Sequence, residues 1–139
     1  MKTAICTCIK DEHPYLKEWI EWHLQRGFDH VFLFEDNGSK PHADIVKNIP
    51  QVTLQSINTV KDEPITIERR QRQMYHFCLR TLKDEYDWLA FIDTDEYVDF
   101  EDGWDLQRLL NEHDEYSGVM LSWMLYGANN RIERPESGV

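Results

Sequence analysis

Short apolar runs rich in β-forming residues alternate along this chain with stretches that have helical periodicity. The apolar runs are Thr3–Ile9, Phe28–Phe34, Val52–Ile57, Trp88–Ile92 and Val119–Trp123. Alternation of this kind predicts an α/β fold, in which a mostly parallel sheet is flanked by helices on both faces. With 139 residues, the chain is long enough for one such core, and we expect a single domain over residues 1–139.

The helices between these strands have recognisable ends. The first follows Pro14, a residue suited to the first helical turn, and ends at Gly27, a common C-terminal cap. Further helical segments are expected at residues 42–48, 66–85 and 104–111. The order of elements is therefore strand–helix, repeated along the chain.

Some polar or reactive side chains are expected to pack in the core. His23 lies beside the apolar face of the first helix, which favours a buried histidine with hydrogen-bond partners over a ligand. Cys6, Cys8 and Cys78 are too few and too scattered for a disulfide framework or a zinc site. We expect these cysteines to be reduced.

The charge of the chain excludes some partners. Fifteen Lys and Arg against 26 Asp and Glu give a formal charge of −11. Nucleic acid is not expected as a partner, because its binding depends on basic residues that neutralise phosphates. The same net charge disfavours an anionic membrane surface. No segment approaches the ~20 apolar residues that cross a bilayer, and we expect a cytoplasmic chain with no transmembrane segment, peripheral membrane association being left open.

An acidic cluster follows the strand at Trp88–Ile92. Asp93 and Asp95 come directly after this strand, with Thr94 between them and Glu96 next. Parallel sheets place their ligands at the carboxyl ends of the strands. Carboxylates this close together repel one another unless a hard cation lies between them. The pattern indicates a site for Mn²⁺ or Mg²⁺ and a diphosphate, although a solvated turn or a helix cap has the same residues.

A longer set of motifs resembles one family. The matching segments are residues 8–39, which include Lys10-Asp11-Glu12 and Asp36-Asn37-Gly38-Ser39, then Gln73, Trp88, Phe91–Val98 and Trp123–Gly127. Their order is similar to that of glycosyltransferases with the GT-A (Rossmann-like) fold, in the group related to families 2 and 92. Because several motifs recur in the same order, this resemblance is more specific than a lone Asp-x-Asp.

The resemblance implies an activity and a set of site residues. The activity is transfer of a sugar from a nucleotide-diphosphate sugar, a UDP-sugar by default, to a hydroxyl of a saccharide or other acceptor. The implied metal ligands are Asp93 and Asp95, with Mn²⁺ or Mg²⁺ as cofactor. The residues expected to bind the nucleotide sugar are Glu12, Asp36, Arg70, Gln73, Asp93 and Thr94. Arg70 is included because arginine suits a diphosphate.

Each nucleotide-site residue also has a structural alternative. Glu12 can cap the following helix, since carboxylates favour helix N-termini. Asp36 begins Asp-Asn-Gly, which is a turn sequence in any fold. Arg70 and Gln73 belong to a polar run that is most often one solvated face of a helix. Glu96, the last residue of the acidic cluster, can have a structural role instead of binding a ligand.

The chain departs from the family pattern at two places. Asp11 stands where the family usually has Asn, and the sequence ends at Val139, where such domains usually continue. We therefore expect a domain that is incomplete at its C-terminus, with an exposed sheet edge that favours a homodimer. Glu133 and Glu136 are the carboxylates that follow the fifth predicted strand, and no catalytic base is assigned.

Two other functions are compatible with the acidic motif. In haloacid-dehalogenase-like phosphatases an apolar strand also runs into Asp-x-Asp, and the first Asp is a nucleophile. That motif usually follows the first strand, whereas Asp93 follows the fourth. A non-catalytic nucleotide-binding module is the other alternative. A phosphatase hydrolyses simple phosphate esters with Mg²⁺, whereas a binding module shows nucleotide affinity without turnover.

Overall fold

The computed structural model describes residues 1–36, 41–57 and 67–126. The strands and helices alternate as predicted. The strands are β1 Thr3–Ile9, β2 His30–Asp36, β3 Val52–Ile57 and β4 Trp88–Ala90; the helices are α1 Leu16–Gln25, α2 Ala43–Val46, α3 Ile67–Leu82 and α4 Leu106–Glu112. The predicted α/β class is confirmed, with several boundaries shifted by a few residues.

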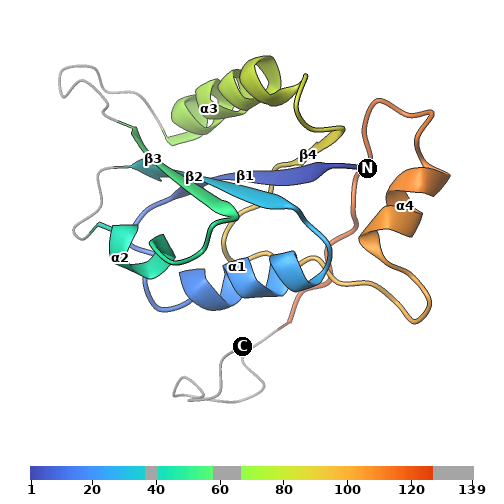
Figure 1. The fold of residues 1–139 in the computed structure, drawn as a ribbon, viewed down its shortest axis with the longest axis horizontal. Helices are drawn as coiled ribbons and strands as arrows, with labels where there is room; N and C mark the ends of the chain where they lie inside the picture. The colour runs from blue at the N-terminus through green and yellow to red at the C-terminus, as the bar shows by residue number, and fades with distance from the viewer. Residues whose placement is uncertain (37–40, 58–66, 127–139) are drawn as a thin grey trace.

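The strands form one parallel sheet in the order β3-β2-β1-β4. Figure 1 shows α1 and α2 on one face of the sheet and α3 on the other. The chain leaves β1 through α1 towards β2, while α3 returns it to β4 on the opposite side of β1. The order therefore reverses between β1 and β4, and a crevice for ligands is expected outside the carboxyl ends of these strands.

Hydrophobic side chains fill both faces of the sheet. On the α1 face, Ile5 and Ile9 pack with Leu16, Trp19 and other buried residues. The α3 face has a smaller cluster made of Cys6, Phe34, Met74 and Cys78. Successive residues of β1 point to opposite faces, so this central strand supplies both clusters. The cysteines are free thiols, as predicted.

The segment that contains Glu96 and Val98 is hydrogen-bonded to α1. The indole nitrogens of Trp19 and Trp22 donate to the carbonyls of Glu96 (2.7 Å) and Val98 (2.8 Å). His23 bridges the same elements, because its Nδ1 donates to the Trp19 carbonyl and its Nε2 accepts from the Val98 amide. The predicted role of His23 is confirmed. Burial lowers the pKa of its imidazole to about 4.

Local sequence accounts for the ends of the helices. Gly27 has φ +97°, a left-handed conformation that ends α1 as predicted, and the Phe28 amide bonds back to the His23 carbonyl. Asp105 begins α4, since its carboxylate accepts from the Arg108 amide at 2.7 Å. None of the described helices is long and apolar enough to span a membrane.

The predicted strand at Val119–Trp123 is wrong. Residues 119–126 form neither strand nor helix, and Met120, Trp123 and Leu125 are 97%, 80% and 89% exposed. Composition suggested a strand, but a strand also needs a neighbouring backbone with which to pair. Within the part of the chain that the structure describes, β4 pairs only with β1.

Candidate functional site

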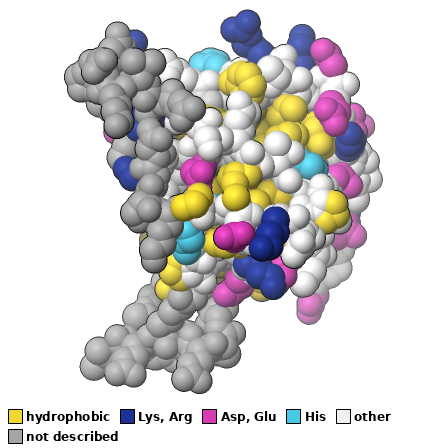
Figure 2. Space-filling view, turned by 60° about the vertical axis from the view of Figure 1, so that its left-hand side comes forward, with side chains coloured by type: hydrophobic (Ala, Val, Ile, Leu, Met, Phe, Trp, Pro, Cys, Tyr) yellow, Lys and Arg dark blue, Asp and Glu magenta, His cyan; other side chains and the backbone are white. Residues whose placement is uncertain are grey.

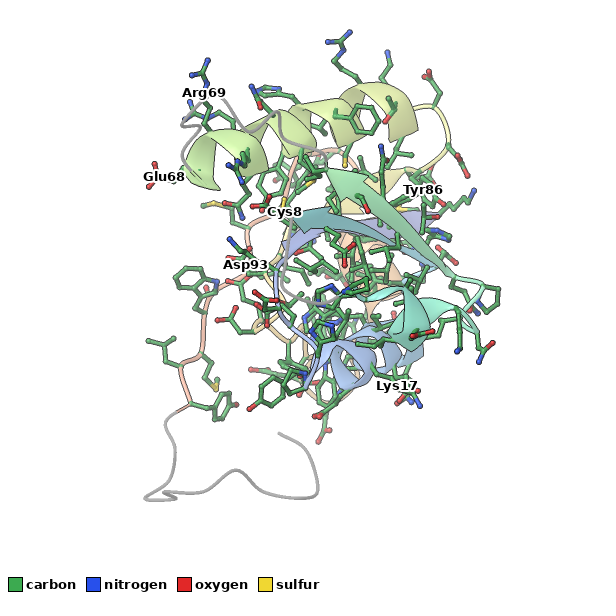
Figure 3. All side chains as sticks on the ribbon, turned by 90° about the vertical axis from the view of Figure 1, so that its left-hand side faces the viewer. Cys8, Lys17, Glu68, Arg69, Tyr86 and Asp93 are labelled. Carbon is green, nitrogen blue, oxygen red and sulfur yellow. The ribbon has the colours of Figure 1, made fainter. Side chains whose placement is uncertain are left out.

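The acidic candidates lie at the carboxyl edge of the sheet. Glu12 follows β1, Asp36 is the last residue of β2, and Asp93 follows β4. Figure 3 has this edge towards the viewer and labels Cys8 and Asp93 there. Burial, together with the charges of Asp36 and Asp93, raises the pKa of the Cys8 thiol to about 11. Both carboxylates therefore act on the end of β1 from the strands on either side.

The acidic cluster folds as a turn after β4. The Glu96 amide donates to the Asp93 carbonyl at 3.1 Å, and the Asp93 amide donates to Glu96 Oε2 at 2.8 Å. Glu96 thus closes the turn. Thr94 is buried, whereas Asp93 and Asp95 are exposed. Within the described ranges, the Asp95 carboxylate makes no hydrogen bond or ion pair.

Asp93 is held from α3 by Gln71. The Gln71 Nε2 donates to Asp93 Oδ1 at 3.0 Å and to the Tyr75 hydroxyl at 2.7 Å. Tyr75 packs against Phe91, with 4.5 Å between ring centroids. Burial raises the pKa of Tyr75 to about 12, and the Asp93 charge acts in the same direction. The Tyr75 hydroxyl is therefore protonated near neutral pH.

Gln71 was missed by the sequence analysis, which named Gln73 instead. Gln73 is exposed and lies on the outer side of α3 beside Arg69 and Arg72. The useful signal was helical spacing, because Gln71 is three residues before Met74 and seven before Cys78, both of which are buried. A polar residue in register with the buried face of α3 points towards the sheet.

Asp36 and Arg70 are brought together as an ion pair. The Arg70 Nη1 lies 2.9 and 2.7 Å from the two Asp36 oxygens, and both side chains are largely buried. The Arg70 Nε is buried and has no hydrogen-bond partner among the described residues. This pair joins the start of α3 to the end of β2.

A histidine that the sequence analysis did not select joins the loops beside Glu12. His42 is fully buried, its Nδ1 donates to Glu35 Oε1 at 2.7 Å, and its Nε2 accepts from the Glu12 amide at 3.1 Å. These bonds assign the tautomer with a proton on Nδ1. Although burial opposes it, the hydrogen bonds from His42 lower the pKa of Glu35. The Glu12 backbone is thereby fixed, while its carboxylate has no partner among the described residues.

The donor set at the acidic turn fits a hard cation. Asp93 and Asp95 offer carboxylate oxygens, the ligands that Mg²⁺ and Mn²⁺ prefer. Within residues 1–36, 41–57 and 67–126, no group of three or more His, Cys, Asp or Glu side chains is arranged to enclose a metal. Such cations often use one or two carboxylates, and substrate phosphates and water complete the coordination. An open site of this type matches the two aspartates.

The fold defines the class of this protein, and the comparison with family models defines its family. A parallel sheet with acidic side chains at its switch point is a Rossmann-like α/β domain. The model of glycosyltransferase family 92 matches residues 3–133, and the chain belongs to that family. The family 92 part of the resemblance is confirmed, while the Asp-x-Asp roles of Asp93 and Asp95 stay predictions.

The chain is similar to glycosyltransferase family 92 proteins of plants. One from Ricinus communis is 24% identical over 98% of this chain and 25% of its own length. One from Oryza sativa subsp. japonica is 21% identical over 98% of this chain and 23% of its own. A third, from Arabidopsis thaliana, is 26% identical over 70% of this chain and 16% of its own. The chain thus spans about a quarter or less of these curated relatives.

Proposed function

We propose that this chain is the donor-binding part of a glycosyltransferase that uses a nucleotide-diphosphate sugar and a divalent cation. The default donor is a UDP-sugar, and the acceptor is a hydroxyl of a saccharide or another molecule. The observation that carries the proposal is the position of Asp93 and Asp95 beyond β4, at the switch point of the sheet. Membership of family 92 favours sugar transfer over the phosphatase alternative.

The carboxylates at the sheet edge would bind different parts of the donor and its cation. Asp95 and Asp93 would hold Mn²⁺ or Mg²⁺, and Gln71 would keep the Asp93 side chain in place. When bound, the cation supplies Lewis-acid stabilisation of the charge on the departing diphosphate. Glu12 and Asp36 would contact the ribose and base from the neighbouring strand ends. The site would thereby orient the sugar towards an acceptor.

The acceptor side of the site is not assigned. Glu133 and Glu136, the carboxylates considered as bases, lie outside the described residues, as does the end of the Trp123–Gly127 motif. Trp123 and Tyr126 are 80% and 87% exposed. The proposal therefore concerns donor binding, and a base for an acceptor hydroxyl is not part of it.

Calorimetric titration of UDP tests the proposal. We expect binding with Mn²⁺, none with a chelator, and at least about tenfold weaker binding by Asp95→Asn, because a metal ligand is lost. Asp102→Asn removes the same charge from an exposed position outside the turn and serves as the matched control. Binding that needs no metal and survives Asp95→Asn would contradict the metal–diphosphate site.

Turnover separates the proposed enzyme from the alternatives. Transfer or slow hydrolysis of the donor sugar supports a glycosyltransferase. Nucleotide binding without turnover would favour the binding module. Hydrolysis of a simple aryl phosphate with Mg²⁺ would favour the phosphatase.

A further inference from the structure

The outer face of α3 carries a continuous line of basic side chains. These residues are Arg69, Arg72, His76, Arg80 and Lys83, and they are all exposed. A spacing of three or four residues places Arg69, Arg72, His76 and Arg80 on one side of the helix, and Lys83 follows directly after its last residue. We call this set the α3 stripe. Figure 3 shows Arg69 pointing away from the sheet, and Figure 2 shows Lys and Arg side chains projecting from the top of the molecule, where α3 lies.

Three of the basic residues in the α3 stripe have no ion-pair partner among the described residues. They are Arg72, Arg80 and Lys83. Several basic residues elsewhere are paired, as in Lys17–Glu21 and Lys47–Asp44. Exposed charges beyond about 8 Å are largely screened at physiological salt. The net charge of −11 therefore does not determine what this face binds.

Apolar side chains border the stripe on both sides. Phe77 is 47% exposed and Leu79 is 46% exposed. Leu79 lies next to Arg72 on one side of the stripe, and Phe77 lies on the other side, where its ring packs edge-on against Phe34 of β2 with 6.1 Å between centroids. Near the start of the helix, Arg69, Arg72, Gln73 and His76 line a shallow hollow. The face thus combines cationic groups, an apolar border and a hollow.

We propose that the α3 stripe docks on an anionic lipid surface. Its cations would contact headgroup phosphates, while Phe77 and Leu79 would enter the boundary between headgroups and acyl chains. A cluster of Lys and Arg on one face of a helix is a recognised signature of binding to anionic lipid headgroups. A nucleic acid or an acidic protein would use the cations but gives no role to half-exposed apolar side chains on both borders.

Docking in this way has a consequence for the candidate site. The first turns of α3 also carry Arg70 and Gln71, which contact Asp36 and Asp93 on the opposite side of the helix. A lipid surface against the stripe would therefore lie within one helix diameter, about 10 Å, of these contacts. The proposal does not depend on the donor or the metal, so it can succeed or fail independently of the proposed function.

Vesicle co-sedimentation of the 139-residue chain tests the proposal. We expect binding to phosphatidylcholine vesicles that contain about one third phosphatidylserine, and little binding to pure phosphatidylcholine. Arg72→Gln with Arg80→Gln should lower the partition coefficient about 25-fold, since each basic residue near the surface contributes about fivefold. The matched control, Lys17→Gln with Lys47→Gln, removes the same charge near α1 and α2 and should bind like the parent.

Further variants and conditions complete the test. Phe77→Ser with Leu79→Ser should weaken binding while the salt dependence stays, and raising salt to about 0.5 M should release the parent chain. Equal binding to pure phosphatidylcholine would overturn the proposal and point to the exposed residues 119–126. Equal losses in the stripe and control variants would also overturn it. The proposal would also be overturned if the folded chain bound neither kind of vesicle, or if the stripe bound an oligonucleotide but neither kind of vesicle.

Discussion

Gln71 donates a hydrogen bond to Asp93, with 3.0 Å between Nε2 and Oδ1, and so ties α3 to the acidic turn after β4. The same nitrogen donates to Tyr75 at 2.7 Å, and Tyr75 packs on Phe91. Side chains that donate hydrogen bonds to a metal-binding carboxylate fix its orientation. The inner side of α3 thus belongs to the candidate site, whereas its outer side carries the basic stripe.

Replacing Gln71 should therefore weaken metal-dependent nucleotide binding. We expect Gln71→Leu to lower the affinity for UDP with Mn²⁺ about tenfold, because Asp93 loses its positioning partner. Gln73→Leu, two residues away on the exposed side, is the matched control. Calorimetric titration measures both. A loss in Gln73→Leu with no change in Gln71→Leu would favour the role that the sequence gave to Gln73.

The Asp36–Arg70 pair should contribute to stability as a unit. A double-mutant cycle with Asp36→Asn and Arg70→Met should give a coupling energy of about 1.5 kcal/mol, because charge-assisted hydrogen bonds are stronger than neutral ones. Urea denaturation of the four proteins measures it. The exposed Asp44–Lys47 pair serves as the control, with an expected coupling below about 0.5 kcal/mol. Equal coupling in the two cycles would show that burial adds nothing to the Asp36–Arg70 pair.

Sequence periodicity predicted much of this fold because each signal was local. β1 and β3 have the predicted bounds, and Gly27 ends α1 through its own backbone conformation. Val119–Trp123 has the composition of a strand, but pairing depends on a neighbouring strand that need not be close in sequence. Its exposed side chains show that an apolar run alone does not create a strand.

The candidate site was predicted only in part. The strand ends supplied Glu12, Asp36 and Asp93, because parallel strands bring their carboxyl ends to one edge. His42 was not selected because its partners are 7 and 30 residues away along the chain. Nothing in the sequence around His42 indicates these hydrogen bonds. Gln71 differs, because its helical spacing from the buried residues of α3 could be recognised in the sequence.

The backbone of Asp11 has a conformation that restricts substitution. Its φ is +57°, in the left-handed region that Asn, Asp and Gly tolerate best. We expect Asp11→Ala to lower the free energy of unfolding by about 1 kcal/mol relative to Asp11→Gly. At Asp44, on the exposed first turn of α2, the order should reverse, because alanine is the better helix former. Urea denaturation of the four variants checks both comparisons, and the same order at both positions would contradict the argument.

Protonation of His23 should destabilise the fold in mild acid. Burial lowers its folded-state pKa from an ordinary 6.5 to about 4, so the unfolded chain binds this proton more readily. Its contribution to stability is therefore complete above pH 6.5 and is lost as pH falls towards 4. Over that window we expect a loss of about 3 kcal/mol, because each pKa unit corresponds to about 1.4 kcal/mol.

The pH dependence of urea denaturation measures this loss. His23→Gln should remove most of the change between pH 6.5 and 4, whereas His76→Gln, at an exposed position on α3, should leave it in place. Comparing variants is necessary, because protonation of carboxylates with lowered pKa values, such as Glu35, also destabilises the fold as the pH falls. The structural reason is specific to the His23 tautomer. A proton on Nε2 would face the Val98 amide, so the hydrogen bond from that amide, one of three that connect residues 96–98 to α1, would be lost. An unchanged pH profile in His23→Gln would mean that this contact does not govern acid stability.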